Sequence, residues 1–305
     1  MTSSLELFRT VEGEIATLMA DHRERREHWY HHEVVPWELG RNYVDEPWDE
    51  SQCTLSPEVR TALHVNLLTE DNLPYYHARL ATCFPADSPM ANWGRLWTAE
   101  EGQHAIAMRS YLLVSRNCNP KELEDERMTV VERGWRTALE DPIDIFVYTS
   151  AQELATRISH RNAGAHADDE TAFNLMKKIA ADENHHFIFY KGVVTAMLKE
   201  DPSQVITSMW RTLADFEMPG TTIPRFVRRS IGMAKLGIYN LRIHADKVVS
   251  PLLREWQIDQ LGGLTADAAE AQDNLMELPS KLIEAAELFE ARMEKTERRS
   301  SRTSA

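Results

Sequence analysis

The chain contains two Glu-x-x-His segments, one from Glu101 to His104 and one from Glu183 to His186. On a helix, residues three apart project from the same side, so each segment directs a carboxylate and an imidazole toward one point. Each segment also lies on an apolar helical stripe; Trp97, for example, precedes Glu101 by four residues. A carboxylate that faces a protein core is costly to bury without a partner. The pattern therefore indicates a buried site for a cation.

Two further glutamates complete a repeated design. Glu70 lies on an apolar stripe before the first segment, and Glu153 lies in the nearly uncharged stretch YTSAQELATRIS. Residue 70 precedes residue 101 by 31 positions, and residue 153 precedes residue 183 by 30, so each pair joins facing points of an antiparallel helix hairpin. Ferritin-like di-iron bundles use one Glu from each of two helices and Glu-x-x-His from each of the other two. A lone Glu-x-x-His is more often a surface pair, but this order predicts a metal site for iron or manganese.

An all-α chain is expected to position these residues, because apolar residues recur at spacings of three and four and alternating strand patterns are nearly absent. Capping residues followed by proline predict helix starts at Ser56-Pro57, Asn119-Pro120, Asp141-Pro142 and Asp201-Pro202. The segment from Ser3 to Glu6 has the spacing of a capping box. The expected helices span residues 3–21, 57–82, 89–116, 120–139, 142–161, 168–199, 202–216, 222–235, 245–257 and 266–296.

A single domain is expected over residues 1–296, with its core helices within about 57–199. Residues 28–56 are rich in Trp, Pro and His without a helical period, and we expect them to form an ordered strap over the bundle. The polar segment 297–305 is expected to be a disordered tail.

Composition narrows the classes of function. The 305 residues include 34 Lys and Arg against 48 Asp and Glu, a formal net charge of −14, which disfavours binding to nucleic acid. No apolar run approaches the ~20 residues of a membrane span, and the first residues do not resemble a secretory signal. Three scattered cysteines (Cys53, Cys83 and Cys118) suit a reducing compartment. We therefore expect a cytoplasmic protein.

Four segments resemble the iron-binding segments of soluble acyl-carrier-protein (ACP) desaturases: TEDNLPYYH (69–77), WTAEEGQHAIAM (97–108), YTSAQELATRISHRN (148–162) and IAADENHHFIFY (179–190). The resemblance continues through residues 217–224, 236–259 and 261–282, so it covers nearly the whole chain. It is closest to the actinobacterial members. It implies a ferritin-like di-iron four-helix bundle surrounded by additional helices.

By position, the resemblance implies six iron ligands: Glu70 and His104 on one iron, Glu153 and His186 on the other, and Glu101 and Glu183 on both. Thr156 matches a threonine beside the oxygen site. Trp29 and Asp182, together with His104, match an electron relay from the surface, although Trp29 is equally explained as a packing residue. The motifs read EEGQH and DENHH where plant members have EENRH and DEKRH. These differences leave the ligand residues unchanged and alter the residues around them.

The activity implied by the resemblance is O₂-dependent insertion of a cis double bond into a saturated acyl chain carried on ACP. Ferredoxin would supply two electrons for each turnover, two Fe ions would be bound per chain, and the chain would form a homodimer. Between Thr221 and Arg254 there are seven basic residues and one acid, so a local positive patch could attract the acidic ACP. The candidate docking residues are Arg225, Arg228, Arg229 and Lys235. An ordinary solvated helix face is the alternative for this patch.

Other functions could use the same ligands. A family member could bind acyl-ACP through a complete metal site without turnover. A ferritin-like ferroxidase is a further alternative, although ferritins are shorter and lack the additional C-terminal helices. A radical subunit of ribonucleotide reductase would need a placed radical tyrosine and different motifs. The length of the acyl chain and the position of the double bond are open from the sequence, and so is the choice between iron and manganese.

Overall fold

Helices make up the regular structure in a computed structural model, which describes residues 3–220 and 222–303. These described ranges contain no strand. The α-helices are α1 (Ser4–Thr10), α2 (Glu12–Arg25), α3 (His31–Val34), α4 (Pro57–Glu70), α5 (Leu73–Cys83), α6 (Pro89–Val114), α7 (Pro120–Arg133), α8 (Pro142–Ala165), α9 (Glu170–Glu200), α10 (Pro202–Ala214), α11 (Phe226–Lys235), α12 (Leu241–His244), α13 (Ser250–Glu255) and α14 (Ala266–Thr303). Short 3₁₀ turns lie at η1 (Trp37–Leu39), η2 (Glu50–Gln52) and η4 (Ile258–Gln260), and a π-helical turn, η3 (Ala245–Val249), joins α12 to α13.

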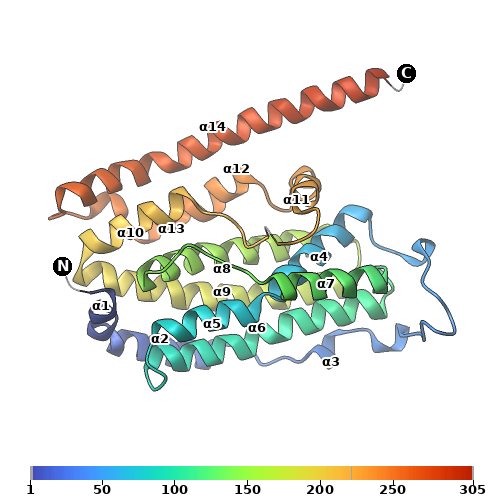
Figure 1. Ribbon diagram of the computed structural model, residues 1–305, viewed down its shortest axis with the longest axis horizontal. Coiled ribbons are helices and arrows are strands. Elements are labelled where there is room, and N and C mark those ends of the chain that lie inside the picture. The colour runs from blue at the N-terminus through green and yellow to red at the C-terminus, as the bar shows by residue number, and fades with distance from the viewer. Residues whose placement is uncertain (1–2, 221, 304–305) are drawn as a thin grey trace.

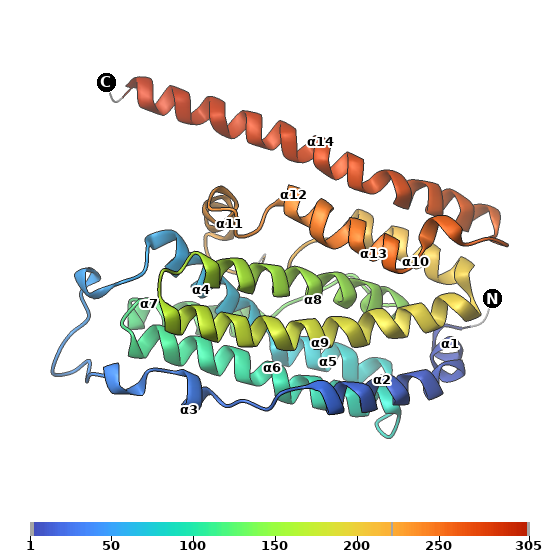
Figure 2. The ribbon, with the colours of Figure 1, turned by 180° about the vertical axis from the view of Figure 1, so that it is seen from behind.

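Four long helices form the centre of the molecule. Both α4 and α9 contact α6 and α8, so the four helices close into a bundle (Figure 1). Helices α10, α13 and α14 cover the α8 side, whereas α2 lies along α6 and α9 on the opposite side (Figure 2). The prediction of an all-α bundle with additional surrounding helices is confirmed.

The predicted helix starts are confirmed at their caps. The hydroxyl of Ser56 accepts a hydrogen bond from the Val59 amide, and the side chains of Asn119, Asp141 and Asp201 cap α7, α8 and α10 in the same way. In each case proline follows at the first helical position, where its missing N–H costs nothing. Ser3 and Glu6 form the expected capping box at α1.

The expectation of one helix over residues 57–82 is wrong, because the chain turns after Glu70 and begins α5 at Leu73. Pro74 has no N–H to donate to the carbonyl of Glu70, and a proline at this point breaks a helix. The expected helix over 3–21 is likewise divided, at Val11. The helix expected over 120–139 ends at Arg133, because Gly134 leaves the helical conformation with φ +67°.

The C-terminal half follows the expected order with shifted ends. Helix α11 begins at Phe226 rather than near residue 222, and the helix expected over 245–257 begins with the π turn before α13. Helix α14 continues to Thr303, through most of the segment expected to be a disordered tail. No Gly or Pro follows Pro279 to end the helix. Residues 304 and 305 lie outside the described part of the chain.

The strap of residues 28–56 is ordered against the end of α6, as expected. The Tyr43 hydroxyl donates to the Leu113 carbonyl at 2.6 Å, and the Trp48 indole donates to the Arg116 carbonyl at 3.0 Å. The strap runs from α2 back to the start of α4 (Figure 1). None of the helices in the described ranges combines the length and apolar character needed to cross a membrane.

The buried apolar residues form two separate clusters, and the polar layer of the bundle lies between them. On α6, Trp93 and Trp97 belong to one cluster, whereas Met108 and Leu112 belong to the other. The residues between them on α6 include the first Glu-x-x-His segment. Each apolar half therefore excludes water from one side of this layer, and the buried polar atoms within it need partners of their own.

Candidate metal centre

The bundle brings together all six side chains that were predicted as metal ligands. Glu70 is the last residue of α4, and the others lie in the middle of α6, α8 and α9. Each is at most 6% exposed: Glu70, Glu101, His104, Glu153, Glu183 and His186. The middle turns of packed helices hold five of the six, and Glu70 lies where α4 ends.

The six residues fall into two groups of four with two members in common. Oxygen and nitrogen atoms of Glu70, Glu101, His104 and Glu183 lie within 4.8 Å of one another, and so do those of Glu101, Glu153, Glu183 and His186. Glu101 and Glu183 belong to both groups. Two residues are thus particular to each group and two carboxylates are shared, which is the grouping that the predicted ligand set requires.

Several polar atoms in this layer lie close together without forming hydrogen bonds. His186 Nδ1 lies 2.8 Å from Glu101 Oε1, and His104 Nδ1 lies 3.4 Å from Glu183 Oε1, yet these four atoms are buried without an aligned hydrogen bond. Glu153 Oε2 is buried and unpartnered in the same way. Unsatisfied buried groups of this kind are rare unless an ion completes them. The residues therefore fit a pair of bound cations with oxygen and imidazole ligands.

The outer nitrogen of each imidazole contacts a carboxylate. His104 Nε2 lies 3.3 Å from Asp182 Oδ2, and the Trp29 indole N–H donates to the same oxygen at 2.7 Å. His186 Nε2 lies 3.0 Å from Glu100 Oε2. When Nε2–H donates to a carboxylate, Nδ1 keeps its lone pair for a metal, and the ring orientation is fixed. The three members of the expected relay (Trp29, Asp182 and His104) thus lie in one hydrogen-bonded chain.

Without a cation, the burial and crowding of the layer shift several pKa values. Burial, followed by the charge of Glu101, raises the pKa of Glu70 to about 8. Burial and the charges of Glu183 and Glu101 raise the pKa of Glu153 well above its usual value. Burial lowers the pKa of His104 and His186, but the surrounding carboxylates outweigh it and raise both pKa values well above the ordinary one. Several ligands therefore hold protons at neutral pH in the metal-free chain.

Metal binding is expected to release protons, because a carboxyl or imidazole must lose its proton before it can act as a ligand. Because the pKa of Glu70 is raised to about 8, this carboxyl is protonated at pH 7, and the raised pKa of Glu153 acts in the same direction, so the affinity should increase as the pH rises toward about 8. For each proton that binding releases, the apparent affinity for the metal falls about tenfold with each unit by which the pH is lowered. Calorimetric titration with Co²⁺ in buffers of different ionisation enthalpy measures the release. A binding heat that is independent of the buffer would contradict this prediction.

A profile of the fatty acid desaturase family matches residues 3–305. The chain belongs to the fatty acid desaturase family. Over 99% of its length and 92% of the relative's, it is 38% identical to the Mycobacterium tuberculosis protein DesA1, which is named as an acyl-ACP desaturase. It is 30% identical to the chloroplastic stearoyl-ACP 9-desaturase of Gossypium hirsutum, over 71% of this chain and 59% of that one. The crystal structure of DesA2 from Mycobacterium tuberculosis superposes with a TM-score of 0.71 at 25% identity, covering 87% of this chain and 98% of DesA2. The ferritin-like fold expected from the sequence is therefore confirmed, as is membership of a family of oxidoreductases.

Sequence reasoning missed a third buried imidazole in this member of the family. His160 Nε2 lies 3.3 Å from Glu70 Oε1 and 3.4 Å from Glu183 Oε1, and its Nδ1 lies 3.2 Å from the Asn66 side-chain amide. His160 belongs to no Glu-x-x-His segment, so the spacing along its own helix does not mark it. Its partners come from α4 and α9, so only the packing of the bundle reveals them. His160 is hydrogen-bonded to Glu70 and lies near Glu183, but it belongs to neither group of four.

Thr156 lies one turn beyond Glu153 and faces a large cavity. Its hydroxyl donates to backbone carbonyls of its own helix, those of Gln152 and Glu153. The cavity has a volume of about 780 Å³ and lies between α4, α8, α11 and α14. Glu70 and His160 lie at its inner end, and apolar side chains such as Met233 line most of it. One side of the candidate metal centre is therefore open to a long apolar space.

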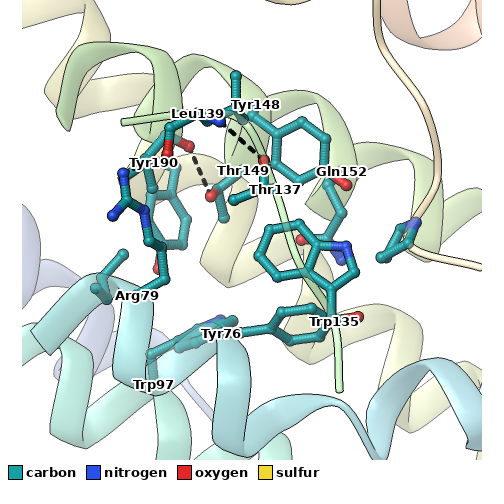
Figure 3. A pocket seen from close by; sticks show the side chains of 13 residues that line it. Tyr76, Arg79, Trp97, Trp135, Thr137, Leu139, Tyr148, Thr149, Gln152 and Tyr190 are labelled. Atoms are coloured by element: carbon teal, nitrogen blue, oxygen red, sulfur yellow. Dashed lines mark hydrogen bonds between the residues drawn. The ribbon is translucent and has the colours of Figure 1, made fainter. Parts of the chain in front are cut away.

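A second, smaller pocket of about 30 Å³ lies along α8. Gln152 lines it one turn before Thr156, and Trp97, whose indole donates to Glu153 Oε1 at 3.0 Å, forms part of its wall. Figure 3 shows the rings of Trp135 and Tyr148 around this pocket. Met218 lines the large cavity and its neighbour Pro219 lines the small one. The two spaces thus approach each other at residues 218 and 219, and of the six predicted ligands Glu70 lines the large one.

The positive patch expected on α11 is largely compensated by α7. Arg225 and Arg229 both form ion pairs with Glu126, and Arg225 also pairs with Glu122. Arg228 is exposed and lines a surface cavity of about 450 Å³ together with these two arginines. Lys235, at the end of α11, is exposed as well. Fewer uncompensated charges are therefore presented than the count along the sequence suggests.

Proposed function

We propose that the chain is an acyl-ACP desaturase that binds two Fe ions through Glu70, Glu101, His104, Glu153, Glu183 and His186. The observation that carries the proposal is the pair of buried four-residue groups beside a long apolar cavity. The 38% identity to DesA1, named as an acyl-ACP desaturase, supports the substrate class. A ferroxidase would need the ligands but would have no use for a cavity of about 780 Å³ at their side.

The reaction removes two hydrogen atoms from adjacent methylenes of the acyl chain and forms a cis double bond. O₂ accepts these two hydrogens, two electrons from a reductant such as ferredoxin and two protons, and leaves as two molecules of water. No side-chain base removes an unactivated C–H proton at neutral pH, so the bound iron pair must supply the oxygen chemistry. The protein holds the chain beside the ligands and keeps water away from it.

The two cavities are the proposed path of the acyl chain. Its thioester end would lie toward α11 and α14, its middle would pass Thr156, and its methyl end would enter the smaller pocket at Trp97. Burial of methylenes contributes about 0.8 kcal/mol each to binding, so an apolar lining selects a saturated chain. The smaller pocket is bounded by large rings and Ile145, which would limit how much of the chain passes beyond the ligands.

Electrons are proposed to reach the site through Trp29, Asp182 and His104. The 2.7 Å and 3.3 Å hydrogen-bond distances along this chain support the proposal. Trp29 itself is 7% exposed and lies on the strap. An external donor would therefore dock against the strap, on the face of the bundle away from α11 and α14 (Figure 1).

ACP is proposed to dock on the side of α11, close to the open end of the large cavity. Arg228 is the main candidate contact, because it is exposed while Arg225 and Arg229 are engaged by Glu126. Positive charge near the entrance would attract the acidic carrier and favour the correct orientation. A homodimer is proposed from the resemblance to the family alone.

The proposal is tested by product analysis. Iron-loaded protein is incubated with stearoyl-ACP and palmitoyl-ACP, reduced ferredoxin and O₂, and the released fatty acids are analysed by gas chromatography and mass spectrometry. A monounsaturated product that requires both O₂ and reductant is expected. If the protein binds two irons and acyl-ACP but forms no unsaturated product from either substrate, it is a binding member of the family without turnover. If it oxidises Fe²⁺ in the absence of acyl-ACP and stores the product, the ferroxidase alternative holds.

A further inference from the structure

Helix α2 lies outside the four-helix bundle, yet it and the residue after it contribute one buried and one partly exposed side chain to the surroundings of a proposed ligand. It packs along α6 and α9 and places His22 and, just after its last turn, Arg26 against Glu100 of α6. His22 is 5% exposed. The side chains of Arg26 and Glu100 are 19% and 16% exposed. No feature of the Glu-x-x-His pattern points to these N-terminal residues.

Three donors converge on the single carboxylate of Glu100. Its Oε2 lies 2.9 Å from His22 Nε2 and 3.0 Å from His186 Nε2, and its Oε1 accepts a hydrogen bond from the Arg26 guanidinium. The rings of His22 and His186 also stack, with centroids 5.8 Å apart and an interplanar angle of 23°. Trp93 closes the other side of His22 with an edge contact. The carboxylate is therefore held at both oxygens and cannot rotate away from His186.

The other imidazole is supported in a different way. Asp182 contacts His104 and accepts from the neutral indole N–H of Trp29, whereas Glu100 is held by a guanidinium and a second imidazole. The two carboxylates occupy matching positions, since each directly precedes a central glutamate and contacts the imidazole of the opposite helix. Glu100 of α6 contacts His186 of α9, and Asp182 of α9 contacts His104 of α6. The residues behind these carboxylates therefore differ between the two halves.

We propose that His22 and Arg26 are positioning residues. They act through Glu100 to hold the His186 ring toward the metal ion that it would bind. The inference rests on the proposed metal centre and deepens it by assigning a separate support to one of its two halves. Glu100 is near enough to the surface that, without these two donors, water would compete for its carboxylate. The His186 ring would then lose the hydrogen bond that fixes its Nδ1 toward the cluster. Loss of such an outer partner typically weakens metal binding 10- to 100-fold.

The test uses the full-length chain loaded anaerobically with Co²⁺, whose paramagnetism shifts the exchangeable ring N–H resonance of each ligating histidine. The variants are His22→Ala, Arg26→Ala and His22→Gln, and Arg25→Ala is the matched control. Arg25 is an exposed neighbour on α2 that pairs with Asp21. Trp29→Phe assigns the resonances, because it removes the donor behind His104 instead. Metal affinity is measured on the same samples by calorimetry.

The alanine variants are expected to lose or broaden the His186 resonance, to retain the His104 resonance, and to bind one of the two ions about 10- to 100-fold more weakly. Glutamine can place an amide N–H where His22 Nε2 lies, so His22→Gln should restore both signals. Unchanged resonances and affinities in His22→Ala and Arg26→Ala would overturn the inference. It would also be overturned if both histidine signals changed together with a lower unfolding temperature, because α2 would then be only a general support. If the wild-type chain binds two ions but forms no unsaturated product, the proposed activity is refuted and the positioning role of His22 and Arg26 is not. If the wild-type chain binds no Co²⁺, both are refuted.

Discussion

The double variant Glu101→Ala, Glu183→Ala is expected to retain less than about a tenth of the iron of the wild-type chain and to form no unsaturated product. These two carboxylates belong to both four-residue groups, so their removal leaves each position with one terminal Glu and one His. Two ligands cannot hold Fe²⁺ against water and buffer. Metal content per chain after anaerobic reconstitution, measured by mass spectrometry of the elements, gives the result directly.

Thermal unfolding separates the loss of metal from the loss of fold. A ligand that binds only the native state adds about 2.7 kcal/mol to its stability when present at 100 times its dissociation constant. Added Fe²⁺ should therefore raise the unfolding temperature of the wild type and leave that of the double variant unchanged. The matched control is the double variant Glu12→Ala, Glu14→Ala, which replaces two exposed glutamates of α2. It should behave as the wild type does. Two irons per chain in the Glu101, Glu183 variant would show that the metal lies elsewhere.

The variant Ala234→Trp is expected to lower kcat/KM for acyl-ACP by about 100-fold or more while the chain keeps its two irons. Ala234 lies on α11 and lines the large cavity, and it is not one of the six proposed ligands. An indole at this position would fill the space through which the acyl chain is proposed to pass. A displaced chain would no longer present its methylenes at the reacting distance, even if ACP still docked. Product formation and metal content are measured on the same preparation.

The matched control is Ala81→Trp, which places the same side chain on an exposed position of α5. It lies outside the linings of the two cavities along the proposed acyl path and should leave turnover unchanged. If Ala234→Trp kept wild-type activity, the acyl chain would have to reach the metal centre by another route. If it lost iron as well, the substitution would have disturbed α4 through α11, and a smaller residue such as Leu would be needed to decide the route.

Local sequence signals determined the helices and the contents of the site. A capping side chain followed by proline acts within a few residues, so the starts of α4, α7, α8 and α10 were predictable. The spacing of three residues within each Glu-x-x-His segment is also local. The error over residues 57–82 has a local cause too: Pro74 removes the donor for Glu70, and that signal was present in the sequence.

The partners of the ligands depended on packing between distant segments. His160 meets Glu70 and Glu183 only because α4, α8 and α9 share one bundle. The compensation of Arg225 and Arg229 by Glu126 similarly joins α11 to α7. A count of charges along the chain cannot detect such pairs, because residues about a hundred positions apart have no spacing that marks them as neighbours.

The sequence by itself thus determined which six residues could form a metal centre, since residue type and helical spacing are fixed by covalent order. The tertiary structure decided what surrounds them: the apolar cavity beside Thr156, the burial that raises the pKa of Glu70, and the contacts of His22 and Arg26 with Glu100. The physical reason is that desolvation, cavity shape and hydrogen bonding to an imidazole's outer nitrogen arise only where separate helices meet.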